Sequence, residues 1–354
     1  MNITYIIGNG FDINIGLNTS YQQFLLNYIN SKSENENYKV IDWFKNELND
    51  DLEKWSDAEL EFGKFTSKIN IDNLDSGKVF EICYKDFVES FCVFLELEQN
   101  RIENDRISSD ICQQFCSGIK NYYKGLRRVD RENLVDHYNT VGGAEAYNII
   151  SFNYTNIFET IYNKCQIYNI GLGLRNNNSS LKNFLMQPMN AHGTLNDNTV
   201  VFGVDNSKQI LDESIFSNCH RSVKDLFVKS TADETIGELI DKSSNDILQR
   251  SNLIYIYGCS LGETDKTWWN RIIKLLKEKN EARVIMYSHE LKKFSALRTR
   301  IDKEEKIDNI KYNLLKHSDF EKDFNDSSLI NKIYVTDEDI FDSFANSIQE
   351  ILKK

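Results

Sequence analysis

The residues best suited to chemistry stand where apolar segments of this sequence end in polar loops. The first is at residues 8–12, which read GNGFD and follow the apolar run Ile3–Ile7. Glycines after a strand let the backbone approach a phosphate closely. Ile13 occupies the place of the third glycine of the dinucleotide fingerprint, so an ordinary NAD dehydrogenase half is disfavoured. Two alternatives remain: a nucleotide-binding loop of another type, in which Asp12 faces a sugar hydroxyl or a backbone amide, and a tight turn that merely needs glycine.

Two further candidates follow later apolar segments. Asn153 stands at the end of the segment AYNIISFNYT, and its amide can hold a ribose hydroxyl and a water together. His192 precedes Gly193 after the segment FLMQPMNA, and an imidazole exchanges protons near neutral pH. His192 is therefore the best candidate for proton transfer. Both residues also have a structural interpretation. The polar residues around Asn153 could simply cap the next helix, with Thr155 or Asn156 as its N-cap, and a lone histidine is more often structural.

A serine motif is present as well. Residues 258–262 read GCSLG and match G-x-S-x-G, the nucleophile elbow, between an expected strand and an expected helix. Asp302 or Asp308 with His317 could complete a triad on chain order alone. However, a polar stretch separates Ser260 from the expected helix, whereas an elbow leads straight into its helix. A serine hydrolase is an alternative that the pattern does not favour.

The bulk composition excludes several classes of protein. The net charge is -12 over 354 residues, which argues against a broad nucleic-acid surface, since such a surface is basic. No run of about 18 apolar residues occurs, so we expect no transmembrane helix. We see no signal peptide, and seven cysteines without export signals indicate reduced thiols in the cytoplasm. Cys112 and Cys116 lack further ligands nearby, so we expect buried helix cysteines and no metal site.

The elements that must position these residues alternate between strands and helices. We expect strands, some of them ending in polar loops, in the segments 2–7, 146–155, 184–193, 199–205, 251–260, 281–289 and 331–336. Residues 31–145 are helical in pattern. The sequence therefore predicts an α/β fold with a Rossmann-like, mostly parallel sheet in residues 1–30 and 146–354, and an all-helical insertion at 31–145. Capping boxes are expected at Thr19 with Gln22 and at Ser56 with Glu59.

Several of these segments resemble one family. GNGFD followed by GLNTSYQQF, then SFNYTNIFETIY, AHGTLNDNTVVFGVD and YGCSLGETD, and the W-x-D-x-E pattern at 55–59, resemble the AbiH family of bacteriophage abortive infection proteins. The same segments are distantly similar to sirtuin-like NAD-binding domains. That similarity implies cleavage of the N-glycosidic bond of NAD, with NAD as substrate and no tightly bound cofactor. This chain differs from sirtuin-like domains in its glycine loop, at Asn9, Phe11 and Asp12. It also lacks the paired C-x-x-C motifs of the sirtuin zinc module, which disfavours protein deacetylation.

The resemblance and the strand ends together nominate the site residues. The resemblance to sirtuin-like domains implies that Asn153 orients the ribose and a water and that His192 is the base. The residues expected to bind the nucleotide are Gly8, Asn9, Gly10, Asp12, Ser20, Tyr154, Gly193, Gly258, Ser260, Asp265 and Ser288.

Other functions remain open at this point. They are a non-catalytic nucleotide-binding sensor or subunit of a defence complex, a serine hydrolase, and a metal-dependent nuclease that would use Asp12 and Glu59. The resemblance implies a phage component or a defence-system partner as the trigger. A homo-oligomer is compatible with each of these functions, with the helical insertion as the expected contact surface.

Overall fold

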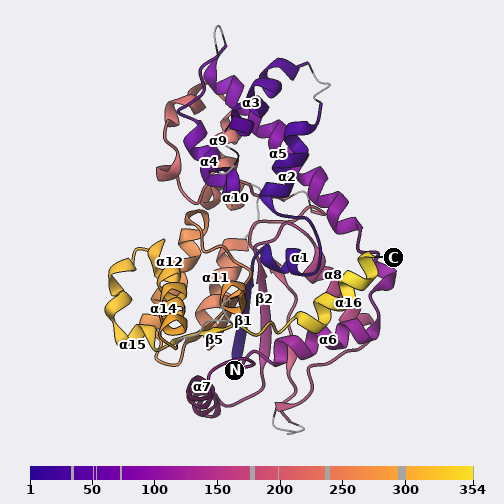
Figure 1. Cartoon of the computed structure of the whole chain (residues 1–354), viewed down its shortest axis with the longest axis vertical. Coiled ribbons are helices and arrows are strands. Elements are labelled where there is room, and N and C mark those ends of the chain that lie inside the picture. Colours follow the sequence, from indigo (N-terminus) through magenta and orange to yellow (C-terminus); the bar gives the residue numbers. More distant parts are fainter. Residues whose placement is uncertain are drawn as a thin grey trace.

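A computed structural model places the chain as an α/β lobe with a helical lobe above it (Figure 1). The residues that it describes are 1–32, 36–50, 52, 54–71, 74–175, 180–197, 199–235, 240–293 and 300–353.

The α/β lobe is built on one parallel sheet with the order β3-β2-β1-β5-β6-β7, in which β4 also pairs with β2. The strands are β1 (Asn2–Ile7), β2 (Ala146–Ser151), β3 (Phe184–Leu185), β4 (Met189–Asn190), β5 (Leu253–Tyr257), β6 (Arg283–Tyr287) and β7 (Ile333–Thr336). The sheet and its helices confirm the predicted Rossmann-like α/β fold. Pro188 interrupts the strand that was expected within 184–193, because proline has no N–H to donate to β2.

Both faces of the sheet are buried, which explains the continuous apolar strands. Ile3, Tyr5 and Ile7 belong to the core on one face, whereas Ile6 belongs to the core on the other. The first face is covered by α1 (Gly10–Asn14), α6 (Ser109–Lys120), α8 (Ile157–Ile167) and α16 (Asp342–Leu352). The second is covered by α11 (Ile240–Arg250), α12 (Lys266–Glu278), α13 (His289–Lys293), α14 (Arg300–Lys316) and α15 (Ser327–Ile330).

The helical lobe has its own aromatic core. It contains α2 (Tyr21–Asn30), α3 (Tyr38–Asp50), α4 (Ala58–Phe65), α5 (Ser76–Asn100), α9 (Arg221–Phe227) and α10 (Lys229–Thr235) (Figure 1). Phe87 packs against Phe62 and Phe24, with ring centroids 4.8 and 4.9 Å apart. α7 (Arg128–Val141) and α6 pack with the sheet core instead. The helical segment 31–145 thus contributes to two cores, and its independence as a domain remains a prediction.

The strand expected at 199–205 is wrong. The segment is not part of the sheet, and Val204 forms only an isolated bridge with Val228. Phe202 and Val204 are buried in the aromatic core of the helical lobe instead. A short run of β-branched and aromatic residues is equally typical of a strand in a sheet and of a segment buried against aromatic helices. The pattern alone therefore could not separate these two environments.

A backbone contact joins the loops that follow the neighbouring strands β1 and β5. The amide of Gly8 donates to the carbonyl of Tyr257 at 2.9 Å, and the amide of Gly10 donates to that of Gly258 at 2.9 Å. A Cβ on Gly10 would lie 2.6 Å from the Cα of Gly258. The glycines of the GNGFD segment are therefore required by the neighbouring loop, whatever the ligand.

This contact can be tested with two glycines of similar, positive φ. Gly258 has a φ of +67° and crowded surroundings, whereas Gly142 has a φ of +63° and nothing within 4 Å of its would-be Cβ. We expect Gly142→Ala to lower the free energy of unfolding by about 1–3 kcal/mol through backbone strain alone. Gly258→Ala should cost about 1–3 kcal/mol more, because its methyl group overlaps the other loop. Urea denaturation measures both, and equal losses would contradict the close contact.

Candidate ligand-binding site

A cavity of about 810 Å³ lies at the carboxyl ends of β1, β2, β5 and β6, with one wall from the helical lobe. This size suits a nucleotide-sized ligand. The predicted site residues that line it are Gly8, Asn9, Gly10, Asp12, Ser20, Asn153, Tyr154, His192, Gly258, Ser260, Asp265 and Ser288. Gly193 is the exception. It has a φ of +72° and abuts Thr199, so it serves a turn beside the cavity.

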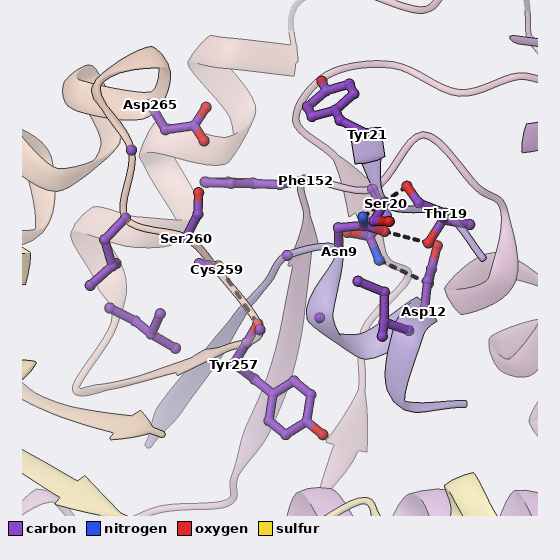
Figure 2. Close-up of a pocket in the computed structure, with 18 of the residues that line it drawn as sticks. Asn9, Asp12, Thr19, Ser20, Tyr21, Phe152, Tyr257, Cys259, Ser260 and Asp265 are labelled. Carbon is purple, nitrogen blue, oxygen red and sulfur yellow. Dashed lines mark hydrogen bonds between the residues drawn. The ribbon is translucent and has the colours of Figure 1, made fainter. Parts of the chain in front are cut away.

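The GNGFD loop is fixed to the segment that follows it. The side-chain nitrogen of Asn9 donates to the carbonyl of Thr19 at 2.9 Å, and the Thr19 hydroxyl donates to Asn9 Oδ1 at 2.6 Å (Figure 2). Ser20 is the N-cap of α2 and accepts from the Gln23 amide, so the capping box expected at Thr19 is wrong. Thr19 is unavailable for capping because its hydroxyl binds Asn9.

Asp12 points into the protein. It is 1% exposed, and its carboxylate accepts from Asn153 Nδ2 at 2.9 Å and from Thr155 Oγ1 at 2.7 Å. Burial raises the pKa of Asp12 to about 6, although both hydrogen bonds act in the opposite direction. The carboxylate therefore joins the loop after β1 to the loop after β2, which explains an acid at the end of GNGFD.

The two predicted catalytic residues lie at neighbouring strand ends. β2 and β4 are paired through Ser151 and Asn190, and Asn153 and His192 follow these residues. Asn153 is 3% exposed, and its Oδ1 has no hydrogen-bond partner. His192 is 5% exposed, with its ring 5.0 Å from that of Phe152.

The second polar atom of interest is His192 Nε2. It lies 3.2 Å from Asp265 Oδ1 without the alignment of a hydrogen bond. Buried polar atoms are nearly always satisfied. The oxygen of Asn153 is therefore the atom of this site best placed to serve a ligand, whereas His192 Nε2 faces the Asp265 carboxylate.

A buried lysine that the sequence did not single out connects the walls of the cavity. Lys229 Nζ lies 2.8 Å from Glu59 Oε2, 3.1 Å from Asp265 Oδ1 and 3.0 Å from the carbonyl of Thr264. The Tyr154 hydroxyl donates to the other oxygen of Glu59 at 2.6 Å. Burial acts to lower the pKa of Lys229, but the two carboxylates outweigh it and raise that pKa above its ordinary value.

The same network explains the W-x-D-x-E pattern. The N-cap of α4 is Asp57, which accepts from the Leu60 amide at 3.1 Å, so the capping box expected at Ser56 with Glu59 is wrong. Glu59 binds Lys229 and Tyr154 instead. Burial opposes ionisation of Asp265, yet Lys229 and His192 outweigh it and hold the pKa of Asp265 below its ordinary value.

The cavity is acidic. The carboxyl groups among the residues that line it are Asp12, Asp57, Glu59, Asp265 and Glu290, and the described lining contains no lysine or arginine. Burial, followed by the charge of Glu59, raises the pKa of Asp57 to about 6. An electrostatic environment of this kind favours neutral and cationic groups over phosphates.

The serine motif does not assemble a triad. Ser260 lines the cavity, but the 3-10 turn Glu263–Asp265 separates it from α12. Asp302, Asp308 and His317 are outside the lining, and His317 Nδ1 lies 3.3 Å from a carboxylate oxygen of Glu263. The geometry therefore gives no support to a serine hydrolase.

The cysteines and possible metal ligands are also placed by the structure. Cys112 and Cys116 are buried, as predicted, and Cys116 Sγ lies 3.9 Å from Cys165 Sγ. Over the described ranges, no group of three or more His, Cys, Asp or Glu residues could hold a metal ion. Asp12 and Glu59, the residues considered for a nuclease, face Asn153 and Lys229 respectively.

The fold defines an α/β protein with a cavity at the carboxyl edge of a parallel sheet, the edge at which ligands usually bind in such sheets. A family profile described as "Bacteriophage abortive infection AbiH" matches residues 4–287. The chain belongs to this family, and this supports a role in anti-phage abortive infection. No curated protein matches the chain. None of the described helices has the length and apolar character required to cross a bilayer.

The lysine network gives a stability prediction. Lys229→Met would leave Glu59 and Asp265 buried without their cation, and we expect it to lower the free energy of unfolding by about 3–5 kcal/mol. Lys224→Met is the matched control, since Lys224 pairs with Glu213 at 2.8 Å with side chains 41% and 47% exposed. The control should change stability by about 0–1 kcal/mol. Chemical denaturation of both variants makes the comparison, and a small effect of Lys229→Met would contradict the network.

Asp12 gives a pH prediction. Its pKa is about 6 in the folded chain against an ordinary 3.8, so the folded state binds the proton more tightly. Stability therefore falls as pH rises from about 4 to 7, by roughly 3 kcal/mol for this group. Asp12→Asn lacks the titration, so the wild type should lose stability relative to this variant over that range. Urea denaturation at several pH values tests this, and a difference independent of pH would rule it out.

Proposed function

We propose that this AbiH family protein limits phage growth by cleaving the N-glycosidic bond of NAD to nicotinamide and ADP-ribose. The observation that carries the proposal is a buried acceptor without a hydrogen-bond partner, Asn153 Oδ1, on the wall of the same nucleotide-sized cavity that His192 and Asp265 line. An amide oxygen can hold a ribose hydroxyl, and an imidazole can accept a proton.

In the proposed reaction the bond between the ribose C1′ and the nicotinamide nitrogen breaks, and its electron pair leaves with nicotinamide. The oxygen of a water bonds to C1′, and His192 takes the proton that the water loses. Positive charge develops on the ribose as the bond breaks. The carboxylates of Glu59 and Asp265 line the cavity and stabilise that charge.

The acidic lining also orients the substrate. The nicotinamide ring of NAD is cationic, so the nicotinamide riboside half belongs beside the carboxylates. The amides of Gly8 and Gly10 donate to backbone carbonyls, so we assign the pyrophosphate to other groups. Ser260 and Ser288 also line the cavity and are the groups left to hold the pyrophosphate.

The test is nicotinamide release from NAD by the purified protein, with and without lysate of phage-infected cells. We expect Asn153→Ala and His192→Ala each to lower the rate by about 100-fold or more. Ser260→Ala should keep catalysis, because no triad forms around it. His220→Ala is the control histidine, since His220 is exposed and caps α9 outside the cavity. No release by the wild type under either condition, or full activity of both variants, would refute the proposal.

A further inference from the structure

The side-chain amide of Asn153 is held in one orientation. An ionised carboxylate only accepts hydrogen bonds, so the atom of Asn153 that lies 2.9 Å from Asp12 Oδ1 must be the nitrogen. The second oxygen of Asp12 is occupied by the Thr155 hydroxyl, which prevents the carboxylate from turning away. The amide oxygen of Asn153 therefore remains at the cavity wall as a fixed, unsatisfied acceptor.

We infer that Asn153 Oδ1 accepts a hydroxyl of the ligand's sugar, with Asp12 as the positioning residue, so that a nucleoside without phosphate is a sufficient ligand for this part of the cavity. The inference rests on the proposed function and names the feature of the substrate that is recognised. An acceptor in this position selects a ligand that carries a donor, which a phosphate oxygen at neutral pH does not supply.

The charges around Asn153 support the same ligand class. Asp12, Asp57, Glu59 and Asp265 line the cavity, and Lys229, the cation nearest to two of these carboxylates, is engaged by Glu59 and Asp265. Phosphate groups would be repelled here, whereas a ribose diol is neutral and a pyridinium base is cationic. A pyridinium riboside combines both features.

Asp12→Asn is the sharpest test variant. An asparagine at this position can donate to Asn153 Oδ1, which consumes the acceptor while it changes the side chain least. Asp339→Asn is the matched control. Asp339 is also buried and also accepts from an asparagine amide, Asn14 at 3.0 Å, and from a hydroxyl, that of Tyr257 at 2.8 Å, but it is outside the cavity lining.

The experiment measures binding by titration calorimetry with a carbocyclic nicotinamide nucleoside, which retains the diol and the pyridinium but cannot be cleaved. Its dideoxy form and its 5′-phosphate are the comparison ligands. The wild type should bind the diol about tenfold more tightly than the dideoxy form, the effect of one or two neutral hydrogen bonds. Its affinity should depend less on the 5′-phosphate than on the diol, because the carboxylates of the lining repel a phosphate. Asp12→Asn should lose the preference for the diol, and Asp339→Asn should keep it.

Asn153→Ala removes the acceptor outright and decides the question if Asp12→Asn does not fold. Equal binding of the diol and dideoxy forms by the wild type, a preference that survives in Asp12→Asn or Asn153→Ala, or a larger gain from the 5′-phosphate than from the diol would overturn the inference. The outcome is separate from catalysis. A diol preference without nicotinamide release would refute NAD cleavage and leave this recognition in place. Nicotinamide release without a diol preference would refute the recognition and leave NAD cleavage in place.

Discussion

Two carboxylates from different lobes share one buried ammonium group, and the shape of the cavity depends on this arrangement. Glu59 comes from α4 in the helical lobe and Asp265 from the loop after β5, and Lys229 lies between them. A buried carboxylate without its cation is costly by several kcal/mol, so neither lobe can shift alone. Tyr154 binds Glu59 from the end of β2, which brings a third element into the same network.

Much of the sheet could be predicted from the sequence for a simple physical reason. A parallel strand that is buried on both faces needs an unbroken apolar run, as at Leu253–Tyr257. The strand ends then predict the edge at which polar residues meet, and Asn153, His192 and Ser260 do line one cavity there. Residues 199–205 show the limit, because burial among aromatic helices selects the same residue types as burial in a sheet.

The polar connections could not be predicted, because their partners are far apart in the chain. Lys229 and Glu59 are separated by 170 positions, and Asn153 and Asp12 by 141. Local patterns offered competing explanations of equal quality, such as a helix cap for Glu59 and a phosphate loop for the glycines. Only the packed structure shows which hydrogen-bond partner each group has, and this decides between a group that serves the fold and one that remains for a ligand.

The contact between the loops after β1 and β5 has a consequence for how this cavity can diverge between relatives. Gly10 and Gly258 leave no room for a side chain on either backbone, and their hydrogen bond joins two segments about 250 residues apart in sequence. An insertion in one loop would therefore require a compensating change in the other. A change of side chain at Ser260, which lines the cavity, can therefore alter the ligand without moving this crossing.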